Sequence, residues 1–419
     1  MSRSALEALE VKLANEYERA LATPASLDLT RGKPAADQLD LSTPLDGILQ
    51  GAVAARDGTD IRNYGGLRGI PEARELGARL LDVDADLVIA GGNSSLWFMH
   101  LVMDTAMHHG LLNQPWREMA ETVKALCPIP GFDRHFTLTE AHGIEMINVA
   151  MTPTGPDMDV IESKVEADPD IKCIWCVPKY QNPTGCIFSA DTVQRLAELP
   201  TRAGDAFTVF WDNAYSVHDL EFPPPPLESL MKHAQRAGTQ ARMVMFASTS
   251  KITYAGSGVA FLASGAAMLD AIEARMSIMT IGPDKMNQLR HTRWLDGRLE
   301  AHMKAHAELI RPKFEAVQNG LERDLGGFDV ASWTNPKGGY FITVDTHAGL
   351  AAKTITLADA AGVKLTRAGA PFPYAKDPED RTIRLAPTYA SLEETVMAVD
   401  LLCLCIKLAT ARKFLAKAA

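Results

Sequence analysis

One lysine in the sequence lies where its amine could do covalent chemistry. Lys251 follows the apolar run 243–247 and three hydroxyl residues, and a glycine-rich loop comes after it. Such a run, bounded by turn-forming residues, predicts a short buried strand with Lys251 just beyond its carboxyl end, where open α/β sheets bind ligands. Burial disfavours the charged ammonium, and a neutral amine can form a Schiff base. The alternative is a solvated loop lysine without a chemical role.

Polar side chains follow two other predicted strands. Asp212 ends the apolar run 207–211, with Tyr215 shortly after it, and Asn182 lies in the turn that follows the run 171–177. A carboxylate at the end of a buried strand is costly unless a cation or a hydrogen-bond donor meets it. Because parallel strands end at one edge of a sheet, we expect these side chains to lie near Lys251.

The segment 91–95, Gly-Gly-Asn-Ser-Ser, predicts a phosphate site. It joins the predicted strand 87–90 to an apolar helix over 96–108. Free N–H groups at the start of that helix, together with Asn93, Ser94 and Ser95, would point at one anion. The segment is not the G-x-G-x-x-G fingerprint, so a single small phosphate is favoured over a dinucleotide.

Alternating strand and helix patterns over 56–297 predict an α/β fold whose large domain is a doubly wound, mostly parallel sheet. We expect a smaller α/β domain from residues 1–55 and 298–419, connected by a long helical stretch over about 289–325. Arg384 interrupts the apolar strand 382–386 in that second domain. A buried arginine there requires an anion, either a fixed protein carboxylate or a bound ligand.

Composition favours a soluble enzyme of a reducing compartment. The 419 residues carry 52 acidic and 42 basic side chains, a net charge of −10 that argues against nucleic-acid binding. Neither a transmembrane run nor an apolar signal peptide is apparent, so we expect a cytoplasmic protein that binds no membrane. Cys173 and Cys176 have redox spacing but lie in an apolar run, which predicts a buried strand instead.

Six motifs, in order along nearly the whole chain, resemble the fold-type I pyridoxal-phosphate-dependent aminotransferases of class I/II. Three further segments, 30–34, 130–135 and 248–258, are most similar to the bacterial subgroup Ic aspartate aminotransferases. The six motifs are Tyr64-Gly-Gly-Leu-Arg-Gly69, Asn182-Pro-Thr-Gly185, Asp212-Asn-Ala-Tyr215, Ser248-Thr-Ser-Lys251, Gly338-Gly-Tyr-Phe341 and Arg384.

The resemblance implies a role for each matching residue. Lys251 would bind pyridoxal 5′-phosphate covalently and later move a proton, while Asp212 would pair with the pyridine N–H. Tyr215 and Asn182 would bond to the phenolic oxygen of the cofactor. Arg384 would bind the substrate α-carboxylate beside Gly32 and Asn182. The phosphate would be held by Asn93, Ser94, Ser95, Ser248, Ser250 and, from the second subunit of a homodimer, Tyr64.

The sequence departs from this family at one position and leaves two others open. Relatives commonly have a phosphate-binding arginine where this chain has Gly258. The aromatic residue that stacks on the ring falls on Ile129 or Phe132, and we favour Phe132. Several cations could bind a substrate side-chain carboxylate, namely Arg31, Lys33, Arg68, Arg290 and Arg293.

The expected reaction is transamination from an L-amino acid, aspartate first, to 2-oxoglutarate. One alternative is an aminotransferase of other specificity or a pyridoxal-phosphate lyase on the same scaffold, since the segment 130–134 also resembles aminocyclopropane carboxylate synthase. A second alternative is a regulator that uses this fold to sense an effector. Regulators of that kind carry a basic DNA-binding domain first, which the N-terminal residues do not resemble.

Overall fold

The computed structural model describes residues 2–22 and 26–417, and its largest element is an eight-stranded sheet of order β2-β9-β8-β7-β6-β3-β4-β5. All strands except β9 and the short edge strand β5 run in one direction. The predicted mostly parallel sheet is therefore confirmed. The strands are β2 (Val88–Gly91), β3 (Lys124–Ile129), β4 (Glu145–Thr152), β5 (Gly155–Pro156), β6 (Ile171–Cys176), β7 (Thr208–Asp212), β8 (Met243–Ser248) and β9 (Ala260–Ala263).

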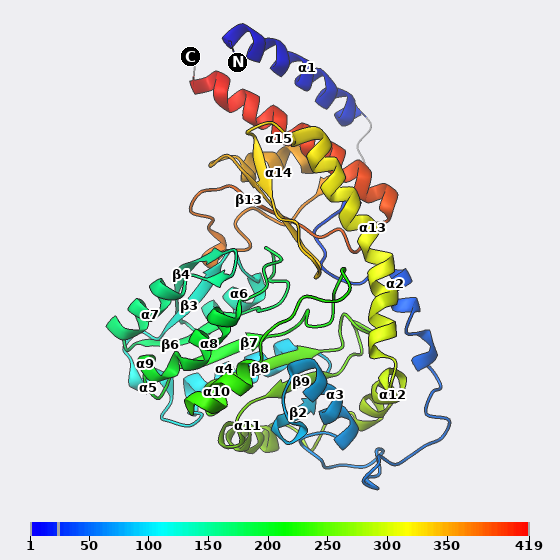
Figure 1. Cartoon of the computed structure of the whole chain (residues 1–419), viewed down its shortest axis with the longest axis vertical. Helices are drawn as coiled ribbons and strands as arrows, with labels where there is room; N and C mark the ends of the chain where they lie inside the picture. Colours follow the sequence, from blue (N-terminus) through cyan, green and yellow to red (C-terminus); the bar gives the residue numbers. More distant parts are fainter. Residues whose placement is uncertain (1, 23–25, 418–419) are drawn as a thin grey trace.

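Helices cover both faces of this sheet (Figure 1), because alternate side chains of a strand point to opposite faces. In β7, Phe210 packs into the apolar core on one face and Trp211 into the core on the other. Strands buried on both faces read as continuous apolar runs. The Trp211 face carries α3 (Pro71–Leu81), α7 (Met158–Ala167), α8 (Ala190–Glu198), α9 (Pro200–Ala203), α10 (Leu230–Ala237) and α12 (Lys285–Leu295). The Phe210 face carries α4 (Ser95–His108), α5 (Trp116–Met119), α6 (Asp133–Ala141) and α11 (Ala266–Met279).

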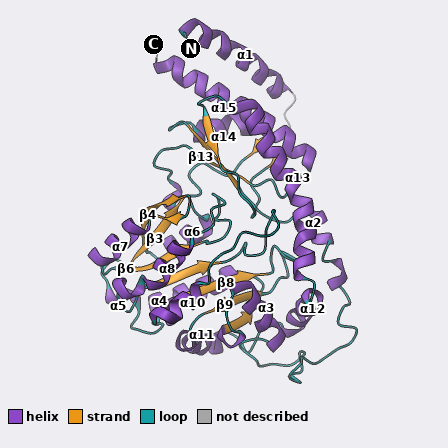
Figure 2. Cartoon of the chain, viewed as in Figure 1, coloured by secondary structure: helices purple, strands orange, loops and turns teal. Residues whose placement is uncertain are grey.

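A second group of elements brings the two ends of the chain together around its own core (Figure 2). Its antiparallel sheet has the order β10-β11-β13, and β1 pairs in parallel with β12 through Leu27 and Val363. The N-terminal helix α1 lies along the C-terminal helix α15. The limits 1–55, 56–297 and 298–419 stay a prediction. The elements are α1 (Arg3–Ala22), β1 (Leu27–Asp28), α2 (Ala36–Asp40), α13 (Leu299–Leu325), β10 (Ala331–Trp333), β11 (Ile342–Thr346), α14 (Ala351–Ala360), β12 (Val363–Lys364), β13 (Thr382–Leu385) and α15 (Leu392–Lys417).

The prediction of one helical stretch over about 289–325 is wrong, since the structure has two helices there, α12 and α13. The chain breaks between α12 and α13 at Gly297, whose φ of +63° lies in the left-handed region that favours glycine. After the break, α13 runs from beside α12 to the second group of elements (Figure 1). None of the helices in the described ranges is long and apolar enough to cross a membrane.

Cys173 and Cys176 lie in β6 and are buried with free thiols. The strand interpretation of their redox-like spacing is therefore confirmed. Successive residues of a strand alternate between faces, so two cysteines three positions apart point to opposite sides of the sheet and cannot pair locally.

Candidate active site

The carboxyl edge of the parallel strands gathers the side chains that the sequence indicated. Asp212 is the last residue of β7, and Gly91 is the last residue of β2. Lys251 lies three residues beyond the end of β8, and Tyr215 and Asn182 follow β7 and β6. This edge is where doubly wound sheets bind their ligands.

The carboxylate of Asp212 is buried and only half satisfied. Its Oδ2 accepts a hydrogen bond from Nε2 of His135 at 3.0 Å, and the His135 ring stacks on Trp175 at 4.3 Å between ring centres. Its Oδ1 is buried and has no hydrogen-bond partner among the described residues. A buried oxygen without a donor costs free energy, so Oδ1 fits a site that a ligand N–H completes. Phe132 packs edge-to-face against His135.

Lys251 lies in the same buried region. Burial lowers the pKa of its ammonium below the ordinary value, and the negative charge of Asp212 partly opposes that shift. Its Nζ lies 5.0 Å from the centre of the Tyr215 ring. Burial also raises the pKa of Tyr215, so its hydroxyl keeps its proton and can donate. The site therefore combines an amine that loses its proton easily with a neutral phenol.

The backbone that carries Lys251 is fixed by buried donors. The Lys251 carbonyl oxygen lies 3.2 Å from Nε2 of His218 and 3.4 Å from the hydroxyl of Tyr340. Gln38 Nε2 in turn donates to that hydroxyl at 3.1 Å. Burial lowers the pKa of His218 to about 3, so its imidazole is neutral and Nε2–H is free to donate. Gln38 belongs to α2, which ties the N-terminal segment to the lysine loop.

Two further histidines bind the next carbonyl along the chain. Nε2 of His302 and Nε2 of His306 lie 2.7 Å and 2.9 Å from the oxygen of Ile252. A carbonyl only accepts, so both Nε2 atoms carry protons, and Nδ1 of His306 accepts from Gln38 at 3.2 Å. Burial lowers the pKa of both imidazoles, that of His306 to about 4. Our sequence reasoning missed this network, although the i, i+4 spacing of His302 and His306 on α13 was a usable signal.

The predicted phosphate site lies at the start of α4. Ser94 caps this helix by accepting a main-chain N–H at 3.3 Å. The hydroxyl of Ser250 donates to the carbonyl of Asn93 at 3.3 Å and lies 3.1 Å from the hydroxyl of Ser248. Ser95 is the first helical residue. The lysine loop and the glycine turn thus place several hydroxyls around one helix N-terminus, which favours an anion.

Arg384 is buried in β13 and has protein partners. Its Nη1 donates to Oδ1 of Asp133 at 3.1 Å and to Oδ1 of Asn182 at 3.4 Å, and its Nη2 donates to Thr366 at 3.3 Å. Its Nε is buried and has no partner among the described residues. The sequence left open a fixed carboxylate or a ligand, and the structure supplies a carboxylate, Asp133, that sequence reasoning had not singled out.

A cavity of about 540 Å³ lies beside Arg384 and Asp133. Phe341 packs under the guanidinium, at 5.0 Å from its ring centre, and Gly32 packs on Phe341 so closely that an added Cβ would lie 2.2 Å from the ring. Arg367, which sequence reasoning also missed, lines this cavity and is exposed. The cavity therefore offers cations that can meet a carboxylate.

Tyr64, a predicted site residue, has no contact with Lys251 among the described residues. Its side chain is 81% exposed. Its loop is nevertheless fixed, since Nζ of Lys285 donates to the carbonyls of Asn63 and Gly65, both at 2.7 Å. A rigid loop that presents an aromatic ring to solvent suits a contact with another molecule.

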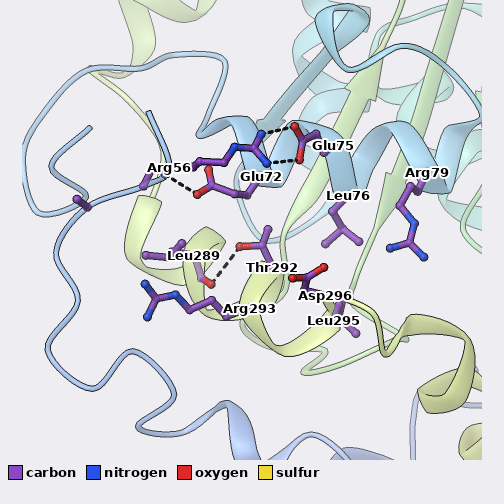
Figure 3. Close-up of a pocket in the computed structure, with 12 residues that line it drawn as sticks. Arg56, Glu72, Glu75, Leu76, Arg79, Leu289, Thr292, Arg293, Leu295 and Asp296 are labelled. Carbon is purple, nitrogen blue, oxygen red and sulfur yellow. Dashed lines mark hydrogen bonds and ion pairs between the residues drawn. The ribbon is translucent and has the colours of Figure 1, made fainter. Parts of the chain in front are cut away.

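A different hollow of about 490 Å³ lies between α3 and α12 (Figure 3). Within it, Arg56 forms an ion pair with Glu75, and the main-chain N–H of Arg56 donates to Glu72 at 2.6 Å. None of the residues expected to bind the cofactor or the substrate α-carboxylate lines it, whereas Arg384 lines the cavity described above. We therefore place the candidate active site at the sheet edge.

Comparisons with known proteins agree with this fold. Residues 1–418 match the family described as aspartate amino-transferase. An aspartate aminotransferase of Corynebacterium glutamicum is 43% identical over 393 residues, 93% of this chain and 90% of the relative. The crystal structure of an aspartate transaminase from the same species has a TM-score of 0.95 at 40% identity, covering 99% of this chain and 98% of that one. An α-aminoadipate aminotransferase from Thermus thermophilus, 20% identical over 97% of this chain and 96% of its own with a TM-score of 0.75, shares the fold.

The fold is therefore that of the fold-type I pyridoxal-phosphate-dependent aminotransferases, as the motifs implied. Within that class, the chain belongs to the aspartate amino-transferase family.

Proposed function

We propose that this protein is a cytoplasmic aminotransferase that uses pyridoxal 5′-phosphate to move the amino group of an L-amino acid, aspartate first, to 2-oxoglutarate. The family and the relative named aspartate aminotransferase support this reaction and donor. The observation that carries the proposal is a half-buried lysine whose pKa is lowered, near Asp212, whose buried Oδ1 has no donor among the described residues.

The residues present fit the cofactor. Asp212 Oδ1 would accept the hydrogen bond of a protonated pyridine nitrogen, and Phe132 would lie against the ring. Tyr215 and Asn182 would donate to the phenolic oxygen, while the start of α4 with its serines would hold the phosphate in place of the arginine that relatives have at Gly258. When bound, pyridoxal phosphate supplies the electron sink for charge that develops at the substrate α-carbon.

Lys251 would serve first as the covalent attachment point and then as the base. Its lowered pKa gives a larger share of neutral amine, which is the nucleophilic form. The amine at the same Nζ would also be the base that takes the substrate α-proton and returns it during transamination. The histidine and tyrosine bonds to the Lys251 and Ile252 carbonyls would keep Nζ over the site during both steps.

Arg384 would bind the substrate α-carboxylate through its planar fork. Arg367 would bind the side-chain carboxylate of the substrate, because Arg367 lines the same cavity as Arg384. The sequence candidates have other contacts: Arg68 is bound by both Asp270 and Glu273, and Arg293 lines the hollow of Figure 3. The others pair with Asp28 (Arg31), Tyr389 (Lys33) and Asn287 (Arg290).

A homodimer would complete the site. Exposed apolar side chains lie close to Tyr64, since Gly65 N–H donates to the carbonyl of Ile281 at 3.1 Å and Ile281 is 64% exposed. Ile278, nearby on α11, is 74% exposed. An apolar patch around a fixed loop marks a protein interface, and a second copy docked there would bring Tyr64 to the partner's phosphate site.

Borohydride treatment of cofactor-loaded protein, followed by peptide mass mapping, tests the attachment. We expect one cofactor-modified peptide, the one that contains Lys251, and none in Lys251→Ala. A modified peptide elsewhere, or none in the native protein, would contradict the proposed site.

A panel of amino acids with 2-oxoglutarate as acceptor tests the reaction. We expect aspartate to be the fastest donor, with glutamate and oxaloacetate as products. A faster donor of another type would mean an aminotransferase of other specificity. Product formed without any acceptor would mean a lyase, and cofactor binding without turnover would favour an effector sensor.

A further inference from the structure

Three histidines and an aspartate from two helices meet on the surface of the large sheet domain, away from the strand edge. His100, Asp104 and His108 follow one another at intervals of one helical turn on α4, and His142 follows the last turn of α6. We refer to these four residues as the histidine cluster. Ligand atoms of Asp104, His108 and His142 all lie within 4.8 Å of one another. Residues four apart share one face of a helix, so α4 presents three potential ligands to one side.

We propose that the histidine cluster binds one divalent transition-metal ion, with Zn²⁺ as the reference, through Asp104, His108 and His142. Imidazole nitrogen with one carboxylate oxygen is a donor set that suits Zn²⁺. Zinc holds such atoms about 2.0–2.2 Å away, so ligand atoms around a tetrahedral ion lie about 3.4 Å apart. The ligand atoms, now within 4.8 Å of one another, would have to move closer by rotation of these partly exposed side chains. A water molecule would complete the tetrahedron.

His100 supplies the outer contact that a metal-binding histidine usually makes. Nε2 of His142 lies 3.3 Å from Nδ1 of His100. If Nδ1 of His142 binds the ion, its Nε2 carries the proton and donates to His100. Such an acceptor fixes the tautomer and the ring orientation of a ligand histidine.

The position of the cluster also favours a cation. His108 is the last residue of α4 and His142 is the C-cap of α6, so both lie at the negative ends of helix dipoles. Two arginines and a further histidine also face the cluster. Arg117 lies 3.2 Å from Nδ1 of His108, while Arg275 and His109 each lie 3.9 Å from the Asp104 carboxylate. Arg117 competes with an ion for His108. An ion bound to Nδ1 of His108 would displace the Arg117 guanidinium. An ion bound to Nε2 would leave the proton on Nδ1, where its N–H would face that guanidinium.

Calorimetric titration of Zn²⁺ into the chelator-treated, cofactor-loaded protein tests the proposal without any measurement of activity. We expect one ion per chain, and zinc X-ray absorption should report imidazole and carboxylate ligands. His108→Gln and His142→Gln should each weaken binding by at least about tenfold. The partly exposed His347 lies between β11 and α14, in the second group of elements, and provides a control. His347→Gln should bind Zn²⁺ like the native protein.

Arg117→Gln removes the competing cation and should bind Zn²⁺ more tightly than the native protein. Two results would overturn the proposal. One is the absence of stoichiometric binding in the native protein. The other is binding that persists unchanged in both His108→Gln and His142→Gln, which would place the ion elsewhere. Unchanged affinity in Arg117→Gln would overturn the assignment of His108 as a ligand.

Discussion

The guanidinium of Arg384 forms an ion pair with the carboxylate of Asp133, with 3.1 Å between Nη1 and Oδ1. The two residues come from different parts of the fold, since Arg384 lies in β13 and Asp133 begins α6. The Arg384 side chain is 8% exposed, whereas that of Asp133 is 30% exposed. Asp133 can therefore turn toward solvent while Arg384 stays, and a substrate carboxylate can take its place.

Arg384→Lys should weaken the binding of amino-acid substrates and of dicarboxylates such as succinate by roughly 10–100-fold, because a lysine keeps the charge but loses the planar fork. Cofactor occupancy should stay unchanged, and the melting temperature should change little. Inhibitor affinity and melting temperature are measured on the same variant. Unchanged affinity with a large fall in melting temperature would make Arg384 a structural residue.

Asp133→Asn should have the opposite effect on the same site. An amide at this position no longer competes as an anion for Arg384, so succinate should bind several-fold more tightly and the KM for aspartate should fall. Glu140→Gln is the matched control, because Glu140 lines the same cavity. Weaker succinate binding in Asp133→Asn than in Glu140→Gln would mean that Asp133 orients Arg384 for the substrate instead of competing with it.

Asp212→Ala should still bind the cofactor but should lose transamination by on the order of a thousandfold or more, about 4 kcal/mol of barrier. Without the carboxylate, nothing at this position keeps a pyridine nitrogen protonated. Cofactor content is read from absorbance, and single-turnover kinetics with aspartate give the rate. Turnover near that of the native protein would mean that the pyridine ring of the cofactor does not bind beside Asp212.

The residues that end strands could be located from the sequence, while their partners could not. Asp212 and Lys251 follow strands buried on both faces, and such strands are continuous apolar runs with a visible end. The bond from His135 to Asp212 and the ion pair of Arg384 with Asp133 depend on how α6 packs over the sheet edge. No local pattern specifies that packing.

The same limit explains the helix break and the carbonyl network. Gly297 sits in a run of helical periodicity, and glycine within a helix pattern is only a weak signal for a break. His302 and His306 are visible as an i, i+4 pair on one face of a helix. Their role depends on Ile252, which is some fifty positions away in the chain.

Mixed dimers test whether Tyr64 completes a site in a second subunit. Lys251→Ala and Tyr64→Phe chains, each of low activity, should form hybrids in which one site has both native residues. Hybrid activity should therefore exceed the average of the two parents. Chains with different tags allow hybrids to be purified and confirmed. Activity equal to that average, in confirmed hybrids, would mean that each chain holds a complete site.

Protonation of His306 on unfolding should lower the free energy of unfolding as the pH falls from 7 to 5. An unfolded histidine titrates near pH 6.5, whereas burial lowers the pKa of folded His306 to about 4. Between these values the unfolded chain binds more protons, so the free energy of unfolding decreases with falling pH. For this one residue, linkage gives a loss of about 2 kcal/mol between pH 7 and pH 5.

His306→Gln isolates this contribution, because glutamine can still donate to the Ile252 carbonyl but does not titrate. The change in urea-unfolding free energy between the two pH values should be smaller in this variant than in the native protein by about 2 kcal/mol. The expected difference arises because burial disfavours the charged imidazole, and a proton on Nδ1 of His306 would face the amide of Gln38, so the bond between Gln38 and His306 would be lost. Equal pH dependence in His306→Gln and the native protein would show that this imidazole is not held neutral by the fold.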